Sequence, residues 1–359
     1  MTTGIFTYDL YPIEGGMGTH IYKIYYQNLS KEYPLMFFSP CKNDLDNHIS
    51  FANWTKKFGK NITFSLVFNL RVRKSIRKHK LQKIHIHCGP GGIFLLRKIR
   101  KTKIVAIFHH TYWQQKEYIK EQRWKRIFCI FEKATLKKAD KIICVSKDTK
   151  DVIVEQYKIP NEKVIVIPNV VDTKEYFPIE GIEKIPNSLL YVGRLDERKG
   201  IKFLVKTYSS LAKSSPYIKL YIIGKGPYTS YIQDEIEKNQ LTNIRPLGFV
   251  LQEDLNEWYN KVSCFICPSI FEGFGITVIE AMAAGTPVIA TNVNGIRTIL
   301  SDGYNGYLVD YNDISNLIQK IQLVLSQDNE PIIINALKDV QMKYKLESVL
   351  SQIKESGIL

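Results

Sequence analysis

The chain has 359 residues, of which 45% are hydrophobic and 24% charged, a composition typical of a globular protein rather than of a disordered or fibrous one. This length exceeds what one hydrophobic core usually organises, so we expect two domains. No apolar run approaches the roughly 18 to 20 residues that span a bilayer, and the first residues lack the basic and then apolar pattern of a signal peptide. The sequence therefore predicts a cytoplasmic protein.

The positive charge is concentrated in the first half of the chain. Residues 1–180 hold 32 basic and 16 acidic residues, a net charge of +16, whereas residues 181–359 hold 18 and 19, a net charge of −1. No acidic residue lies between Asp46 and Glu117. A general bias toward lysine would affect both halves. We therefore expect the first half to contact a polyanion, either an anionic membrane surface or a nucleic acid; solvated helix faces are the alternative.

Short β-branched and aromatic runs alternate with helical stretches in the first half. This alternation predicts βαβ units and a parallel sheet, and the near-continuous apolar character of the runs suits strands that are covered on both faces. The predicted strands span 4–8, 34–39, 62–67, 83–88, 103–108, 141–146 and 163–168.

A second unit of similar size follows a linker. Residues 173–187 carry proline, glycine and charges without an apolar period, which predicts that linker. The alternation then restarts, with predicted strands at 188–193, 218–223, 243–248, 263–268, 287–291 and 306–309. We predict an α/β fold of two Rossmann-like, doubly wound domains, 1–172 and 188–331, followed by a helix at about 332–359. Ligands of such sheets bind beyond the carboxyl ends of the strands, so we expect a cleft between the domains.

Two loops that follow predicted strands suit a phosphate group. After the first strand, Gly16 and Gly18 precede a helix, where glycines let the backbone approach a phosphate or a sugar; a tight turn explains them equally well. Arg194 follows the strand at 188–193, and Lys199 stands at the start of the next helix. A planar guanidinium and an ammonium at one strand edge suit a diphosphate.

The segment 268–291 carries the most specific pattern. A predicted strand ends in the glycine-rich loop EGFG at 272–275, and a helix begins near Ile276. Backbone N–H groups at such a helix start are free to hold phosphate oxygens. Glu272 before the helix and Glu280 within it place two carboxylates in apolar surroundings, which is not typical of surface residues.

We expect no metal site. Cys264 and Cys267 have the spacing of a metal-binding pair, but a strand would turn the two thiols to opposite faces, and no second pair completes a zinc site. Asp44 and Asp46 form a DxD pattern that we interpret as chance, because no apolar strand precedes it. Six cysteines are also too sparse for a disulfide framework in this length.

Three histidines of the first half have different interpretations. His109 follows the strand at 103–108, at the edge where ligands bind, and we interpret it as an active-site hydrogen-bond donor; a packed loop histidine is the alternative. His85 and His87 alternate on one strand without an accompanying carboxylate. Core or loop packing is therefore favoured over a metal site for these two.

Together these motifs resemble the retaining glycosyltransferases of family 4, which have the two-Rossmann GT-B fold. The resemblance rests on the E-x7-E motif from Glu272 to Glu280. It also rests, in the order of the family, on GGMG (15–18), VSK (145–147), IPNVVD (167–172), YVGRLDERKG (191–200), IIGKGP (222–227) and LGFV (247–250). It covers nearly the whole chain, most specifically residues 141–310.

The resemblance implies a role for each motif residue. Glu272 would contact the hydroxyls of a donor sugar, and Glu280 would accept hydrogen bonds from the ribose of a nucleotide. Arg194 and Lys199 would neutralise the departing diphosphate in place of a metal ion. Further donor contacts would come from Gly16, Gly18, Gly248, Val250, Gly273, Phe274, Gly275, Ile276 and Thr277. Where the family often has a histidine followed by an acid, this chain has His109 and His110, so either could occupy that position.

The implied activity is transfer of a hexose from a nucleotide diphosphate sugar to an acceptor hydroxyl, with retention of the anomeric configuration and without a cofactor. Cell-surface polysaccharide or glycolipid synthesis is the implied pathway. A glycan or lipid-linked acceptor would lie against the basic first domain, in peripheral contact with the anionic cytoplasmic face of a membrane. The last helix would cross back to the first domain.

Two other functions stay open at this point. A sugar-nucleotide epimerase has the same fold, and a non-enzymatic polyanion-binding protein would use the same basic surface. Nucleic acid is not the expected partner, because no recognition module is present. The motifs do not specify the base, the sugar, the acceptor, the linkage or the oligomeric state.

Overall fold

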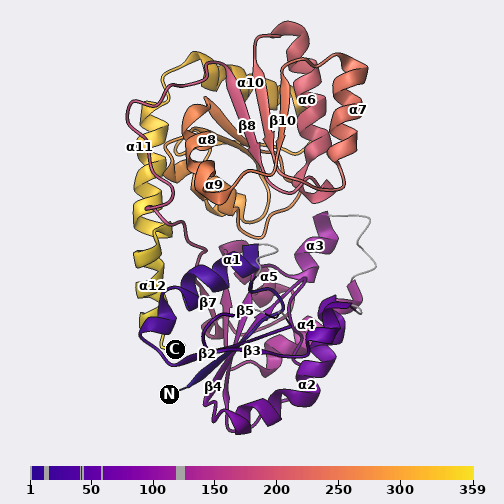
Figure 1. Cartoon of the computed structure of the whole chain (residues 1–359), viewed down its shortest axis with the longest axis vertical. Helices are drawn as coiled ribbons and strands as arrows, with labels where there is room; N and C mark the ends of the chain where they lie inside the picture. Colours follow the sequence, from indigo (N-terminus) through magenta and orange to yellow (C-terminus); the bar gives the residue numbers. More distant parts are fainter. Residues whose placement is uncertain (1, 12–15, 41, 43, 58–59, 119–125) are drawn as a thin grey trace. The chain divides into compact units, whose positions relative to one another are not determined.

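The computed structural model describes every residue except 1, 12–15, 41, 43, 58–59 and 119–125 (Figure 1). The described residues form two compact units. Unit 1 comprises residues 1–170 and 347–359, and unit 2 comprises residues 171–346. Each unit is built around a parallel sheet, which confirms the predicted fold of two Rossmann-like domains. The domain boundaries drawn from composition stay a prediction.

The sheet of unit 1 has the strand order β3-β2-β1-β4-β5-β6-β7. All of its strand pairs are parallel, so every connection crosses over the sheet and most carry a helix. The strands are β1 (Thr3–Phe6), β2 (Leu35–Ser39), β3 (His48–Ser50), β4 (Lys83–Cys88), β5 (Lys103–Phe108), β6 (Lys141–Cys144) and β7 (Val164–Val166). The helices are α1 (Gly16–His20), α2 (Lys60–Lys78), α3 (Tyr112–Tyr118), α4 (Phe128–Lys138), α5 (Lys147–Glu155) and α12 (Leu346–Glu355).

One predicted strand of unit 1 is wrong. Residues 62–67 lie within the long helix α2. The buried apolar residues of α2 are Phe64, Val67, Phe68 and Val72, whose spacing is that of one face of a helix. Within the six residues 62–67, the β-branched and aromatic composition favours a strand. The helical period becomes evident only over the longer segment 60–78. β3, a three-residue strand at the edge of the sheet, is not among the predicted strands.

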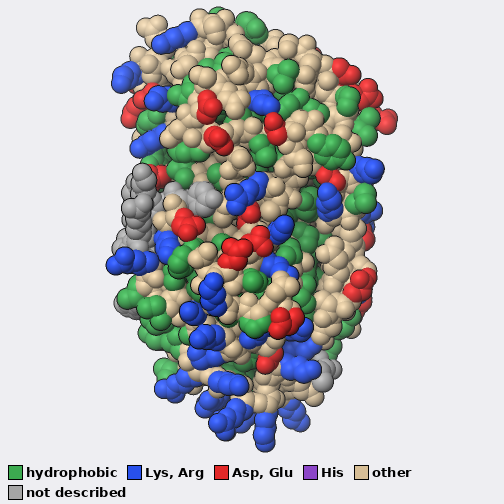
Figure 2. Space-filling view, turned by 180° about the vertical axis from the view of Figure 1, so that it is seen from behind, with side chains coloured by type: hydrophobic (Ala, Val, Ile, Leu, Met, Phe, Trp, Pro, Cys, Tyr) green, Lys and Arg blue, Asp and Glu red, His purple; other side chains and the backbone are tan. Residues whose placement is uncertain are grey.

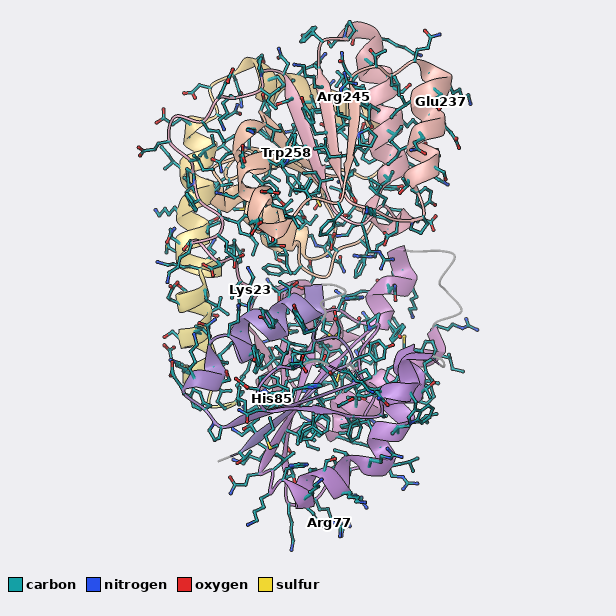
Figure 3. All side chains as sticks on the ribbon, viewed as in Figure 1. Lys23, Arg77, His85, Glu237, Arg245 and Trp258 are labelled. Atoms are coloured by element: carbon teal, nitrogen blue, oxygen red, sulfur yellow. The ribbon has the colours of Figure 1, made fainter. Side chains whose placement is uncertain are left out.

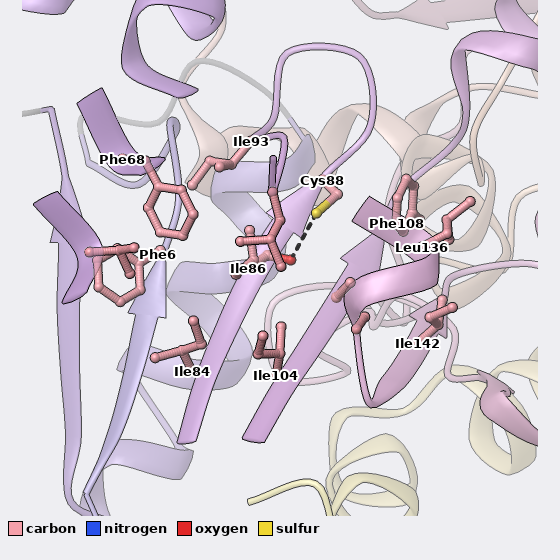
Figure 4. Close-up of a cluster of buried hydrophobic side chains, with 14 of the residues drawn as sticks. Phe6, Phe68, Ile84, Ile86, Cys88, Ile93, Ile104, Phe108, Leu136 and Ile142 are labelled. Atoms are coloured by element: carbon pink, nitrogen blue, oxygen red, sulfur yellow. Dashed lines mark hydrogen bonds between the residues drawn. The ribbon is translucent and has the colours of Figure 1, made fainter. Parts of the chain in front are cut away.

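Aromatic side chains fill the core between the sheet and α2 (Figure 4). The rings of Phe6 and Phe38, on neighbouring strands, stack with centroids 4.4 Å apart, and Phe68 of α2 meets Phe6 edge-on at 5.2 Å. Such pairs add to the free energy gained by burying their apolar area. The core therefore fixes the carboxyl ends of the central strands, from which the candidate site loops begin.

The last helix, α12, packs in unit 1, as the fold prediction states. Ile358 lies just after this helix, and its carbonyl oxygen is 2.8 Å from Nε2 of the buried His85 on β4. At the surface, Lys354 pairs with Glu32 at 2.7 Å. The chain thus passes from unit 1 to unit 2 and returns.

The sheet of unit 2 has the order β10-β9-β8-β11-β12-β13, again all parallel. Its strands are β8 (Ser188–Val192), β9 (Lys219–Ile223), β10 (Ile244–Gly248), β11 (Cys264–Cys267), β12 (Val288–Thr291) and β13 (Tyr307–Val309). Its helices are α6 (Ile201–Ser214), α7 (Thr229–Asn239), α8 (Leu255–Lys261), α9 (Ile276–Ala283), α10 (Ile314–Ser326) and α11 (Glu330–Asp339). Cys264 and Cys267 are buried on β11. Among the described residues, no helix combines the length and the apolar character that crossing a membrane requires.

Candidate active site

The turn after β8 brings Lys199 to the end of β11. Gly200 ends this turn with φ +69°, and a Cβ atom on it would lie 1.8 Å from the carbonyl oxygen of Pro268. Only glycine permits this approach. A backbone hydrogen bond from Ile270 N to Arg198 O (2.8 Å) holds the two segments together. Two cations of the turn therefore reach the loop that follows β11.

Glu272 is the centre of a buried charge cluster in unit 2. It is 6% exposed, and its carboxylate forms an ion pair with Lys199. It also accepts hydrogen bonds from Arg198 Nη1 (3.3 Å) and Ser269 Oγ (3.1 Å). Burial alone would raise the pKa of Glu272, but Lys199 and Arg198 together lower it to about 2. The side chain is therefore a carboxylate at neutral pH.

Arg198 belongs to this cluster although the sequence analysis does not single it out. Its guanidinium also donates to the carbonyl oxygen of Phe271 (3.2 Å), so one side chain holds both the backbone and the carboxylate of the EGFG loop. The predicted cation Arg194 has a different environment: its side chain is 67% exposed and pairs with Asp196 (Nε to Oδ2, 3.2 Å). Its position directly before Lys199 in the sequence could have indicated that Arg198 belongs to the site.

The EGFG loop leads into α9 through a left-handed residue. Gly275, with φ +115°, stands directly before Ile276, the first residue of α9, and no side chain caps the helix. Gly295, after β12, packs on this loop: a Cβ atom there would lie 2.8 Å from Phe274 N and 2.9 Å from Glu272 O. The first N–H groups of an α-helix have no partner within the helix. In α9, Val278 N donates to Gly275 O at 3.1 Å, so the N–H groups of Ile276 and Thr277 are the ones that this rule leaves for a ligand.

Glu280 lies in the second turn of α9 and is 8% exposed. The hydroxyl of Tyr259, on α8, donates to its Oε2 at 3.0 Å. Tyr176 contacts the same carboxylate, and its ring centroid is 5.9 Å from that of Tyr259. Burial, and then the charge of Glu280, raise the pKa of both phenols, so both stay protonated as donors. Sequence reasoning missed both tyrosines, because each is far from Glu280 along the chain.

The loop after β10 lies at the same strand edge. Gly224 N, after β9, donates to Gly248 O at 2.7 Å, which joins the two loops. Lys225 Nζ lies 5.9 Å from the ring centroid of the exposed Phe249, and Val250 is half-buried. The predicted donor residues of unit 2 thus lie at the carboxyl ends of β10, β8 and β11, where β8 and β11 are neighbours and β9 separates β8 from β10.

In unit 1, a carboxylate stands beside the predicted glycine motif. Gly16 begins α1, and Gly18 N donates to Asp9 Oδ2 at 3.1 Å. A Cβ atom on Gly18 would lie 2.7 Å from Asp9 Oδ1, so a side chain would displace this contact. Residue 15, which begins the GGMG motif, lies outside the described residues. The sequence analysis does not single out Asp9.

His109, after β5, belongs to a buried group of imidazoles. Its Nε2 is 3.2 Å from His87 Nδ1, and its ring centroid is 5.1 Å from that of His20. His20 Nδ1 in turn lies 2.7 Å from Asn169 Oδ1. Burial lowers the pKa of all three histidines, that of His20 to about 4, so they are neutral at pH 7. His110 is half-buried.

Buried polar contacts also hold the segment that follows His109. Both carboxylate oxygens of Glu132, on α4, accept from Tyr112 N at the start of α3, at 3.0 and 2.9 Å. The hydroxyl of Tyr157 donates to the same carboxylate.

Within the described part of the chain, no group of three or more histidine, cysteine, aspartate or glutamate side chains is arranged to hold a metal ion.

Two family models match the chain in succession. Glycosyltransferase Family 4 matches residues 14–175, and Glycosyl transferases group 1 matches residues 172–338. Among curated relatives, an uncharacterized glycosyltransferase of Methanocaldococcus jannaschii is 28% identical over 96% of this chain and 95% of its own length. A second one from this organism is 31% identical, over 59% of this chain and 58% of its own length.

The chain is also similar to a third relative and to two solved structures. The UDP-Gal:alpha-D-GlcNAc-diphosphoundecaprenol alpha-1,3-galactosyltransferase of Escherichia coli is 22% identical over 77% of this chain and 76% of its own length. Sucrose-phosphate synthase from Thermosynechococcus elongatus has a TM-score of 0.85 at 20% identity, covering 99% of this chain and 98% of its own. HepE of Anabaena, in complex with UDP and glucose, has a TM-score of 0.75 at 16% identity and covers 99% of both chains. The structures show the fold, and the two adjoining sequence matches show the family. This chain belongs to glycosyltransferase family 4 and has the GT-B fold.

Proposed function

We propose that this glycosyltransferase transfers a hexose from a nucleotide diphosphate sugar to an acceptor hydroxyl, with retention and without a metal ion, in cell-surface glycan or glycolipid synthesis. The observation that carries the proposal is the buried carboxylate of Glu272, compensated by Lys199 and Arg198 at the carboxyl edge of the unit 2 sheet. The UDP-Gal donor of the Escherichia coli relative and the UDP bound to HepE support a UDP-sugar donor.

In the proposed reaction, the bond from the anomeric carbon to the diphosphate breaks, and the acceptor oxygen bonds to that carbon on the same face. The acceptor proton goes to the departing phosphate. Negative charge grows on the diphosphate, where Arg194 and Lys199 stabilise it. An ammonium has three N–H donors, so Lys199 can bind a phosphate oxygen and keep Glu272 in place. Glu272 binds sugar hydroxyls, and Glu280 binds the ribose.

The remaining assignments follow the family resemblance and stay predictions. Backbone groups of the EGFG loop and of the first turn of α9 would hold sugar and phosphate oxygens, and Gly248 and Val250 would face the base. In unit 1, Gly16 and Gly18 would contact the diphosphate, and His109 would donate a hydrogen bond to the sugar.

The first experiment is a binding screen with UDP-, GDP- and ADP-sugars, followed by a hydrolysis assay on those that bind. For the donor that binds, Arg194→Ala and Glu272→Gln should each lower kcat about 10²- to 10³-fold, since each removes one group from the charged site. Arg245→Ala is the matched control, because Arg245 is exposed near the amino end of β10, away from the loops of the site (Figure 3). Thermal unfolding shows whether each variant is folded.

Three outcomes of these assays would contradict parts of the proposal. A full rate for Arg194→Ala would show that the diphosphate lies elsewhere. Loss of activity with a chelator, restored by a divalent cation, would overturn metal independence. An epimerised donor in the absence of any acceptor would identify an epimerase instead of a transferase.

We also propose that unit 1 binds an anionic membrane surface at the cytoplasmic face, where it would meet a lipid-linked acceptor. Lys and Arg side chains gather at the end of unit 1 where α2 ends (Figure 2). We call this the basic face, and it comprises the exposed residues Arg71, Arg73, Lys74, Arg77, Lys78, Arg97, Lys98, Arg100 and Lys101. Arg73 Nη2 donates to Lys98 O (3.0 Å), which joins its two segments.

Exposed aliphatic side chains favour lipid over nucleic acid as the partner of the basic face. Ile62, Leu66 and Leu70 stand at four-residue intervals on α2, and Leu70 is 72% exposed. They extend the outer stripe of the helix that continues in Arg73 and Arg77. Aliphatic side chains gain free energy in the lipid interface, whereas a phosphate backbone offers them no apolar contact. Each basic residue near an anionic surface adds up to about 1 kcal/mol.

Vesicle flotation tests the membrane proposal. The protein should float with phosphatidylcholine vesicles that contain phosphatidylglycerol and not with phosphatidylcholine alone, and binding should weaken as salt is added. Lys74→Glu with Lys78→Glu should abolish flotation, whereas Lys206→Glu with Lys238→Glu, on exposed positions of unit 2, should not. Absence of binding at low salt would end this proposal, and tighter binding to DNA than to the vesicles would favour a polyanion-binding protein.

A further inference from the structure

His87 contacts the predicted active-site histidine directly. It is fully buried on β4, and its Nδ1 lies 3.2 Å from Nε2 of His109, with the two rings nearly parallel at a centroid distance of 5.5 Å. A hydrogen bond between two neutral imidazoles needs an N–H on one ring and a lone pair on the other. The contact therefore determines the position of the proton on both rings.

The second nitrogen of His87 shows which ring donates. His87 Nε2 is buried and has no hydrogen-bond partner among the described residues. If His109 donated, His87 would carry its proton on Nε2, as a buried N–H without an acceptor. If His87 donates from Nδ1, its unpartnered Nε2 carries no proton and has only a lone pair. Buried N–H groups without acceptors are rarer than acceptors without donors, so His87 is the donor.

The neighbouring imidazole is fixed in a similar way. Asn169 Oδ1 can only accept, so His20 Nδ1 carries a proton and donates to it. The ring of His20 meets that of His109 nearly edge-on, at an interplanar angle of 85°. Burial lowers the pKa of His109 and His87 well below the usual value, in agreement with neutral rings. Each ring thus has one defined tautomer.

We propose that His87 is a positioning residue of the active site: it donates Nδ1–H to His109 Nε2, and so confines the proton of His109 to Nδ1. His109 then presents Nδ1–H, and no other N–H, to the donor sugar. This inference rests on the proposed function of His109 as a hydrogen-bond donor. His87 itself does not touch the substrate.

Long-range ¹H–¹⁵N correlation spectra of the histidine-labelled enzyme test the tautomer without any substrate. We expect His109 Nε2 to resonate as an unprotonated nitrogen and Nδ1 as a protonated one, with the signals assigned by their loss in His109→Gln. In His87→Leu, the two nitrogens of His109 should shift toward a common, averaged value. A protonated Nε2 on His109 in the unchanged enzyme would overturn the proposal.

Kinetics test the positioning role. Asparagine places its amide nitrogen where His87 has Nδ1, so His87→Asn should keep kcat within about threefold, whereas His87→Leu should lower kcat about 10- to 100-fold with little change in KM for the donor. His85→Gln is the matched control on the same strand, because it keeps a donor for Ile358 O. Equal losses in all three variants would show a purely structural effect and contradict the proposal.

Two results would separate the role of His87 from the role of His109. If His109→Gln keeps the full rate while the spectra show the expected tautomer, the assigned role of His109 is wrong. If His109→Gln is impaired and His87→Leu is not, the positioning role of His87 is wrong.

Discussion

Lys199 has two tasks in the proposed enzyme. Without a ligand it neutralises the buried carboxylate of Glu272, together with Arg198. When a donor binds, a diphosphate competes for the same ammonium. Arg198 then keeps Glu272 compensated, because its guanidinium also holds the backbone at Phe271 and does not have to move. At the scale of single residues, Arg198 would therefore share with Lys199 the neutralisation of Glu272 while Lys199 binds the diphosphate.

The pKa of Glu272 gives a prediction for stability against pH. The folded state holds this pKa at about 2, below its usual value of 4.5, so the contribution to folding is complete above about pH 4.5 and is lost as the pH falls toward 2. The difference corresponds to about 3 kcal/mol. We expect the free energy of unfolding of the unchanged protein to fall more steeply between about pH 4.5 and pH 2 than that of Glu272→Gln, as measured by denaturant titration.

The matched control for this pH dependence is Glu257→Gln, because Glu257 is half-exposed and pairs with Lys261 at the surface. Surface pairs of this kind contribute little to stability. Parallel profiles for the unchanged protein and Glu272→Gln would show that the charge cluster does not contribute to the acid dependence.

Individual site residues could be predicted from the sequence only where a motif carries them. Glu272, Glu280 and Lys199 stand in recognisable loops. Tyr259, which orients Glu280, and His87, which contacts His109, do not. Each reaches its partner from another element more than 20 residues away along the chain. Such contacts arise from the packing of the fold, and no spacing rule applies to them.

At the scale of elements, the turn 196–200 is held by a close approach of two backbones. Gly200 lies against the carbonyl of Pro268, and this contact sets the distance between the cations and the EGFG loop. The positions of Arg198 and Lys199 therefore depend on the absence of a Cβ atom at residue 200.

Gly200→Ala should destabilise the protein and impair donor hydrolysis. A left-handed φ costs an alanine about 1 to 2 kcal/mol, and the displacement of Pro268 should bring the total to about 3 to 5 kcal/mol. Gly303→Ala is the matched control, since Gly303 has φ +73° with no atom within 4 Å of its added Cβ among the described residues. Thermal and chemical unfolding compare the two. Equal losses of stability in Gly200→Ala and Gly303→Ala would show that the close approach of residue 200 to Pro268 adds nothing to the cost of the substitution.

A helix or strand could be predicted from the sequence wherever its local propensity and its buried positions indicate the same element. Every predicted strand except 62–67 appears in the structure, shortened by one or two residues in most cases. Residues 62–67 lie in α2, where Phe64, Val67, Phe68 and Val72 form an apolar face in the core. In that segment β propensity and helical periodicity disagree, and burial of the periodic face against the sheet decides the outcome.

At the scale of the whole molecule, unit 1 is completed by residues 347–359. Val349 and Ile353 of α12 are buried, and the segment that follows supplies the acceptor of His85. The stability of unit 1 therefore depends on residues that lie on the other side of unit 2 in the sequence.

Ile353→Ala should reveal this dependence. Ile353 is 1% exposed, and its truncation should lower the free energy of unfolding by about 2 to 5 kcal/mol. Hydrogen exchange should show reduced protection of β4 in unit 1 and unchanged protection of β9 in unit 2. The control is Ile334→Ala on α11, where the same side chain is 55% exposed. A loss of protection in β9 as large as that in β4 would contradict this assignment of α12.

The return of the chain to unit 1 has a consequence for biosynthesis. A ribosome releases residues 1–170 first, then the whole of unit 2, and only then the segment that contains α12. A nascent chain halted before that segment holds β4 without the acceptor of His85 and without the apolar cover of Val349 and Ile353. Of the two units, the one that is translated first is thus the one whose folding ends last.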